Sequence, residues 1–192
     1  MGLKTRLFTG GSHLVLGQVV AQGAALLRNI LLARLLAPED FGLATTFMLV
    51  MSMLEMLSNL SAEMLLVQSK EGGSPRYLHA MHGFILVRGA VVSILVYLLA
   101  GSITEIFKVP DLEWAFQVLA VAPLIKAFVH LEYKQVQRNL NFRGELFVEA
   151  VPQLGAVVVL YPLFMIDDAE TLGLWIVLIQ VILVVIVSHL QA

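Results

Sequence analysis

Four polar side chains recur at helical spacing in the long apolar run 43–66. They are Ser52, Glu55, Asn59 and Glu63. At about 100° per residue, this spacing places them within an arc of about 80° on one face of a helix. A charge at the centre of a membrane helix costs about 2.5–3.5 kcal/mol on insertion scales, so such groups face protein or water. The stripe therefore favours a hydrated cavity, with interhelical hydrogen bonding as the structural alternative.

The preceding apolar run, 12–33, carries a second polar stripe. Gln18, Gln22 and Asn29 share a face about 40° wide, and Arg28 lies about 80° away from it. Small residues recur beside the stripe in a pattern that permits close helix packing: Gly17, Ala21 and Ala25. We expect the amides and Arg28 to line the same cavity.

Further cations lie within or at the ends of the apolar runs. Arg88 is close to the middle of run 80–100, at a depth that matches Glu55 on the neighbouring antiparallel run. The two residues either form a buried ion pair or line a cavity where cations meet an anionic substrate. Lys126 and Arg34 are expected to extend toward the membrane surface. The alternative for Lys126 is a cavity where cations meet an anionic substrate, and the alternative for Arg34 is the cavity mouth.

The elements that must position these side chains follow from composition. The chain is 59% hydrophobic and 14% charged, whereas a soluble domain carries about 25% charged residues. Runs of roughly 20 apolar residues indicate membrane-spanning helices rather than the short alternating strands of a barrel. We predict an all-α polytopic membrane protein with six spans, at residues 12–33, 43–66, 80–100, 113–131, 146–166 and 172–190.

Orientation follows from the distribution of lysine and arginine. The N-terminus, the connection after the second span and the connection 132–145 are basic, whereas the other connections are mainly acidic. The positive-inside rule then places both termini in the cytoplasm. The connection 132–145 is expected to be a short surface helix whose Lys134, Arg138 and Arg143 meet lipid phosphates.

Several classes of site are not supported by the sequence. The chain has no cysteine, and its five histidines show no ligand spacing, so no metal site or cofactor is predicted. Each histidine is expected to be a polar residue at the membrane interface. There is no basic stripe suited to nucleic acid, and no metalloprotease, phosphate-loop or nucleophile-elbow motif.

Two connections carry a resemblance to a known family. ARLLAPEDFG at residues 33–42 resembles the first connection of bacterial O-antigen and exopolysaccharide flippases, which belong to the multidrug/oligosaccharidyl-lipid/polysaccharide exporter superfamily. RNLNFRGELFVEAV at residues 138–151 resembles their basic connection into the fifth helix. The chain resembles the N-terminal six-helix lobe of such a protein.

The resemblance implies two six-helix lobes around a central cavity that works by alternating access. The substrate would be a polyprenyl-pyrophosphate-linked oligosaccharide, and arginine suits pyrophosphate because its guanidinium binds phosphate oxygens bidentately. The implied substrate-binding residues are Arg28, Arg34, Gln18, Gln22, Asn29, Asn59 and Arg88. Glu55 and Glu63 are the implied ion-coupling residues. The implied partners are membrane lipid, the lipid-linked oligosaccharide, and a second lobe or another copy of the chain, in the bacterial cytoplasmic membrane.

Three other functions remain open from the sequence. An ion-coupled multidrug or cation antiporter of the same superfamily would share the architecture. A single lobe could also be a remnant that transports nothing. A membrane-embedded enzyme acting on polyprenyl lipids would need an acidic or histidine-arginine cluster, and the acidic stretch 167–170 fits a solvated turn better.

Overall fold

The computed structural model describes residues 3–58, 66–166 and 168–191. Regular structure in these ranges is helical throughout, which confirms the predicted all-α class. The α-helices are α1 (Leu3–Leu35), α2 (Pro38–Ser58), α4 (Pro75–Phe107), α5 (Glu113–Leu119), α6 (Val121–Lys126), α7 (Glu132–Val136), α8 (Arg143–Ile166) and α9 (Leu172–Leu190). Two short 3₁₀ helices, η1 (Pro110–Leu112) and η2 (Gln137–Asn139), join them.

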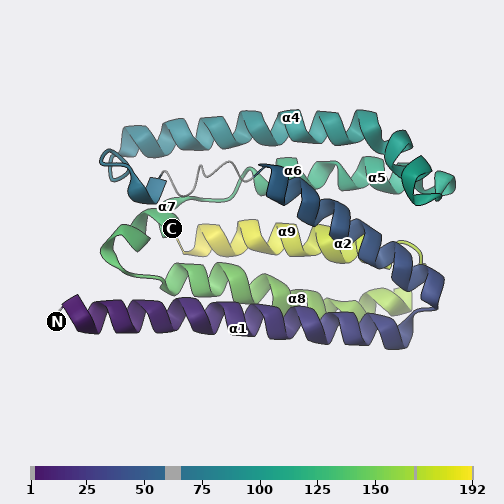
Figure 1. Ribbon diagram of the computed structural model, residues 1–192, viewed down its shortest axis with the longest axis horizontal. Helices are drawn as coiled ribbons and strands as arrows, with labels where there is room; N and C mark the ends of the chain where they lie inside the picture. The colour runs from purple at the N-terminus through teal and green to yellow at the C-terminus, as the bar shows by residue number, and fades with distance from the viewer. Residues whose placement is uncertain (1–2, 59–65, 167, 192) are drawn as a thin grey trace.

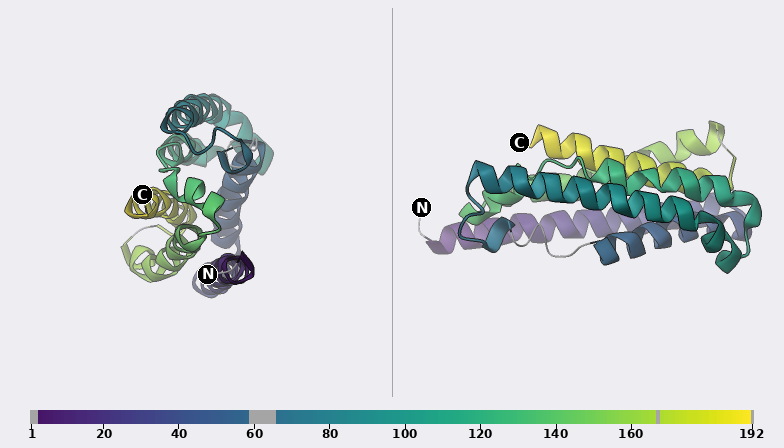
Figure 2. Two further views of the ribbon diagram at one scale, coloured as in Figure 1. Left: turned by 90° about the vertical axis from the view of Figure 1, so that its left-hand side faces the viewer. Right: turned by 90° about the horizontal axis from the view of Figure 1, so that it is seen from above.

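Helices α1, α4, α8 and α9 run along one common axis and form an elongated bundle (Figure 1). Helix α1 begins and α9 ends at the same end of the bundle, where α7 also lies (Figure 1). Viewed along the axis, α1, α8 and α9 form one group and α4 to α6 form another (Figure 2). Helix α2 crosses between the groups and packs on α9 and on α4 to α6.

Small residues bring α1 close to α8. A Cβ atom added at Gly17 would lie 2.9 Å from the Leu146 Cα, so only glycine fits at this approach. Ala21 and Ala24 are buried on the same side, whereas Ala25 is only half-buried. The predicted small-residue face therefore exists, but its third member is Ala24.

The two groups of helices meet through apolar side chains of α2 and α9. The Phe47 ring on α2 contacts the Phe116 ring on α5, with 4.9 Å between centroids, and both side chains are fully buried. At Gly173 of α9 an added Cβ atom would lie 2.4 Å from the Ala44 Cα. The crossing of α2 over α9 thus depends on glycine at position 173.

Four helices are long and apolar enough to cross a membrane: α1 from Gly10 to Leu35, α4, α8 and α9. They coincide with the predicted windows 12–33, 80–100, 146–166 and 172–190. The chain is a multi-pass membrane protein, as its composition indicated. The second and fourth windows are not matched by such a helix in the described ranges, so the count of six spans stays a prediction.

The fourth window, 113–131, is not the single helix that we predicted. Helix α5 ends at Leu119 and α6 ends at Lys126. Pro123 explains the break, because it lacks an N–H and its ring clashes with the carbonyl four residues earlier, that of Leu119. The Ser93 hydroxyl on α4 donates to the Ala120 carbonyl and accepts from the Leu124 N–H, so it pairs backbone groups at the break.

The second window, 43–66, begins as α2 and then enters residues 59–65. Asn59 and Glu63 therefore lie outside the described residues. The other members of that stripe are described, and both Ser52 and Glu55 belong to α2.

Candidate functional site: a charged cavity inside the helical lobe

A cavity of about 270 Å³ lies between the two groups of helices. Side chains from α2, α4, α6, α7, α8 and α9 line it, although most of these helices are apolar. Its polar lining includes Glu55, Arg88, Lys126, Tyr133, Lys134, Glu149, Gln153 and Gln180. The prediction of a polar cavity within the membrane bundle agrees with this arrangement.

Glu55 is paired with Lys126 rather than with Arg88. The Lys126 ammonium donates to the Glu55 carboxylate at 2.5 Å, across the α2–α6 contact. Arg88 lines the same cavity from α4. The expectation that Lys126 extends to the membrane surface is wrong, because the break at Pro123 brings the last residue of α6 to the cavity wall.

Arg28 lies behind the cavity wall and connects three helices. Only 8% of the residue is exposed. Its Nη1 donates to the Gln153 Oε1 on α8 at 3.2 Å and to the Gln180 Oε1 on α9 at 2.8 Å. Both glutamines line the cavity, whereas Arg28 itself does not. The predicted substrate role of Arg28 would thus require it to act through these amides or after a rearrangement.

The other predicted residues of α1 lie on its exposed face. Gln18, Gln22, Asn29 and Arg34 are all exposed, and none of them lines the cavity. The three amides do share one face, as their spacing predicted. Because lipid cannot hydrogen-bond with amide groups, this face is suited to water or to another protein surface.

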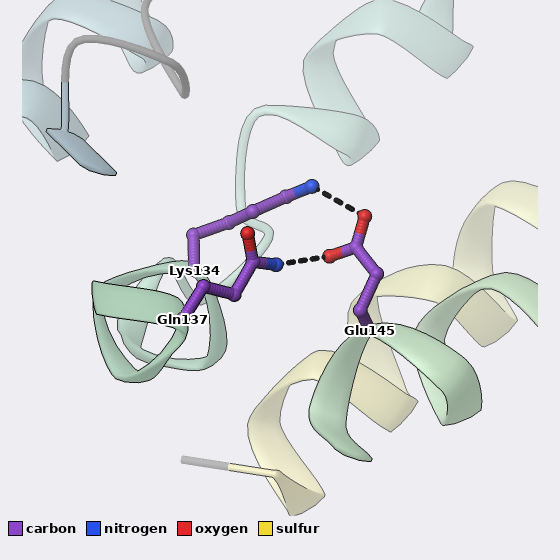
Figure 3. A network of polar contacts seen from close by, with 3 residues as sticks. All are labelled: Lys134, Gln137 and Glu145. Carbon is purple, nitrogen blue, oxygen red and sulfur yellow. Dashed lines mark hydrogen bonds and ion pairs between the residues drawn. The ribbon is translucent and has the colours of Figure 1, made fainter. Parts of the chain in front are cut away.

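A buried polar network joins α7 and η2 to the start of α8 (Figure 3). Glu145, in the first turn of α8, is 8% exposed. One carboxylate oxygen accepts from the Lys134 ammonium at 2.6 Å, and the other accepts from the Gln137 amide at 2.5 Å. This network attaches the connection 132–145 to α8 and holds Lys134 beside the cavity.

The basic connection does not present all its cations to lipid, as we had expected. The Arg138 Nη1 donates to the carbonyl oxygens of Leu66, Val67 and Ser69 at 2.5–3.0 Å. These carbonyls lie where the described helical residues 66–68 end, and there the backbone dipole favours a cation. Arg138 and Lys134 are therefore engaged inside the protein, and Arg143 is exposed.

The sequence reasoning missed the polar face of α8. Glu145, Glu149 and Gln153 follow a four-residue spacing, and the same arithmetic that identified the α2 stripe places them within about 80°. Glu149 and Gln153 line the cavity, and Gln180 on α9 completes this wall. The spacing was a usable signal for α8, whereas a single glutamine in α9 gave none.

Three histidines, predicted as separate interfacial residues, lie together. The His130 ring is 5.3 Å from that of His82 and 5.4 Å from that of His189, centroid to centroid. The His82 Nε2 accepts from the Leu131 N–H, so its proton is on Nδ1, which donates to the Leu78 carbonyl. His82 thus fastens the segment before α7 to α4.

Comparisons with known proteins show the family of this chain. A family model described as "Polysaccharide biosynthesis protein" matches residues 31–191. The lipopolysaccharide biosynthesis protein WzxC of Escherichia coli (strain K12) is 28% identical over 151 residues, which cover 74% of this chain and 29% of that protein. The chain thus spans less than a third of this relative, and no solved structure matches it. Because the family model covers most of the chain, including the helices that line the cavity, the chain belongs to the polysaccharide biosynthesis protein family.

Proposed function

We propose that the chain takes part in moving a polyprenyl-pyrophosphate-linked oligosaccharide across the bacterial cytoplasmic membrane. It would act as the N-terminal lobe of a two-lobe flippase that works by alternating access, with both termini in the cytoplasm. The observation that carries the proposal is the charged cavity inside an apolar bundle, in a chain of the polysaccharide biosynthesis family.

The chemistry of the cavity lining supports this substrate class. Arg88, Lys126 and Lys134 bring cations from three different helices, which suits a diphosphate. Gln153 and Gln180 offer amide groups that can hydrogen-bond with sugar hydroxyls. Glu55 would couple the movement to an ion gradient, because a membrane carboxylate can carry a proton or bind a cation.

The exposed amide face of α1 supports a second lobe as partner. Gln18, Gln22 and Asn29 would be costly against lipid, and a second six-helix half or another copy of the chain would cover them or enclose water beside them. In that arrangement Arg34, at the end of the same helix, would stand at the mouth of the space between the lobes.

The proposal is tested in the bacterium that carries this chain. Deleting its gene is expected to remove surface polysaccharide and to leave lipid-linked oligosaccharide in the inner leaflet. Complementation with Arg88→Gln should restore less polysaccharide than wild type at equal membrane level. Arg143→Gln, which removes an exposed arginine outside the cavity, is the matched control and should restore it fully. Unchanged polysaccharide and unchanged lipid-linked oligosaccharide in the deletion strain would refute the proposal.

An ion-coupled multidrug antiporter is the second candidate, and the carboxylates in the cavity favour it. Glu55 and Glu149 both line the cavity and would attract organic cations. Proton- or sodium-driven efflux of a cationic dye from vesicles, with polysaccharide unaffected by the deletion, would support the antiporter instead of the flippase.

A further inference from the structure

The Glu55–Lys126 ion pair differs from the Lys134–Glu145 ion pair in its access to the cavity. The Lys126 and Glu55 side chains are 36% and 38% exposed, and both line the cavity. The Lys134 and Glu145 side chains are 14% and 10% exposed, and Glu145 is not part of the lining. A ligand in the cavity can therefore reach the Glu55–Lys126 pair directly.

The carboxylates of Glu145 and Glu55 also differ in the number of hydrogen bonds that they accept. Both oxygens of Glu145 accept hydrogen bonds, one from Lys134 and one from Gln137. Among the described residues, Glu55 accepts one such bond, through Oε1 from Lys126. A half-exposed pair with a single contact is worth about 0.2–1 kcal/mol, so a better anion can displace its carboxylate.

We propose that Lys126 is an anion-binding residue of this cavity and that Glu55 occupies it until a phosphate group displaces the carboxylate. The ammonium is a compact charge with three donors, which suits a phosphate oxygen. Glu55 then acts as an internal competitor that sets the affinity for the anion. The inference deepens the proposed function, because it takes the same cavity as the substrate site.

The position of Lys126 in the fold supports this role. It is the last residue of α6, which the break before Pro123 separates from α5. Arg88 from α4 and Lys134 from α7 line the same cavity, whereas Glu149 from α8 limits the positive charge. Displacing Glu55 would thus leave the Lys126 ammonium available to an anion in a cavity that Arg88 also lines.

The test measures binding to the full chain in nanodiscs of phosphatidylcholine. The probes are inorganic pyrophosphate and farnesyl diphosphate, and their binding is measured by isothermal titration calorimetry. Glu55→Gln removes the competing charge and should tighten binding about fivefold. Lys126→Gln should weaken binding by about tenfold or more, the typical cost of one charge-assisted hydrogen bond, and Lys126→Arg should retain most of it.

Matched controls remove the same charges away from the cavity. Glu113→Gln removes a carboxylate of α5 that accepts from Gln117, and Lys70→Gln removes an exposed lysine in the turn before α4. Neither variant should change the affinity for pyrophosphate.

A second set of nanodiscs containing phosphatidylglycerol distinguishes the source of the phosphate. If the lipid competes with pyrophosphate in wild type but not in Lys126→Gln, the site takes phospholipid headgroups as well as free diphosphate, and the anion site itself is supported.

Two results would overturn the inference. One is equal pyrophosphate affinity in wild type, Glu55→Gln and Lys126→Gln with only thermal stability lowered, which would make the pair a brace between α2 and α6. The other is no binding of any probe by wild type and Glu55→Gln. Neither result bears on polysaccharide export, which the deletion strain tests separately. Conversely, tighter pyrophosphate binding by Glu55→Gln would support the anion site even if the deletion strain exported polysaccharide normally. That second result would refute the flippase alone.

Discussion

Replacing Arg28 by methionine is expected to destabilise the lobe by about 1–3 kcal/mol. The guanidinium makes two side-chain hydrogen bonds, to Gln153 at 3.2 Å and to Gln180 at 2.8 Å. A hydrogen bond from a charged group contributes about 1.5–3 kcal/mol in soluble proteins, but polar contacts between membrane helices average about 0.6 and reach about 1.7 kcal/mol. Two polar contacts of the strength found between membrane helices together give a destabilisation of about 1–3 kcal/mol. The Gln180 contact is the shorter and should carry the larger share.

The measurement is reversible unfolding in mixed micelles with increasing sodium dodecyl sulfate, followed by circular dichroism. A double-mutant cycle with Gln180→Leu should show a coupling of about 1 kcal/mol, because removing either partner removes the same contact. Arg34→Met is the matched control. This arginine is exposed at the end of the same helix, so its loss should change the free energy of unfolding by less than about 0.5 kcal/mol.

The result also separates the two roles of Arg28. Loss of stability together with loss of polysaccharide export would agree with a residue that holds the cavity wall in place. An Arg28→Met variant as stable as wild type that nevertheless lost export would refute the reasoning from these hydrogen bonds, and would restore the direct substrate contact predicted from the sequence.

Two further predictions concern helix packing and the network of Figure 3. Gly17→Ala should lower stability by about 1–3 kcal/mol, because its Cβ atom would lie 2.9 Å from the Leu146 Cα. Gly23→Ala in the same helix meets nothing within 4 Å and should raise stability by about 0.5–1 kcal/mol, so equal effects in the same unfolding assay would contradict the close α1–α8 approach. Glu145→Gln should cost about 3 kcal/mol, because it leaves the ammonium of Lys134 in a buried position without its carboxylate. A loss below about 0.5 kcal/mol would show that the pair does not hold α7 to α8.

Much of the helical architecture is readable from the sequence. The apolar runs that become α1, α4, α8 and α9 are long enough to cross a bilayer, and such lengths admit few structures other than helices. The prediction failed at residues 113–131, where hydropathy suggested one helix. There the clash of the Pro123 ring with the Leu119 carbonyl produced a break, and the Ser93 hydroxyl on α4 pairs the Ala120 carbonyl and the Leu124 N–H beside it. A hydropathy average does not detect such a residue, so the proline itself was the only sequence signal for the break.

By itself, the sequence determined which residues share a face of one helix, because the period of a helix is fixed. It therefore gave the grouping of Gln18, Gln22 and Asn29 correctly. Only the tertiary structure decided which faces meet, because that depends on how α2 crosses α9 at Gly173 and on where α6 ends. Those two features lead Glu55 to pair with Lys126 instead of Arg88. They also leave the α1 amides outside the cavity, since α1 packs on α8 through its small residues and buries Arg28 instead.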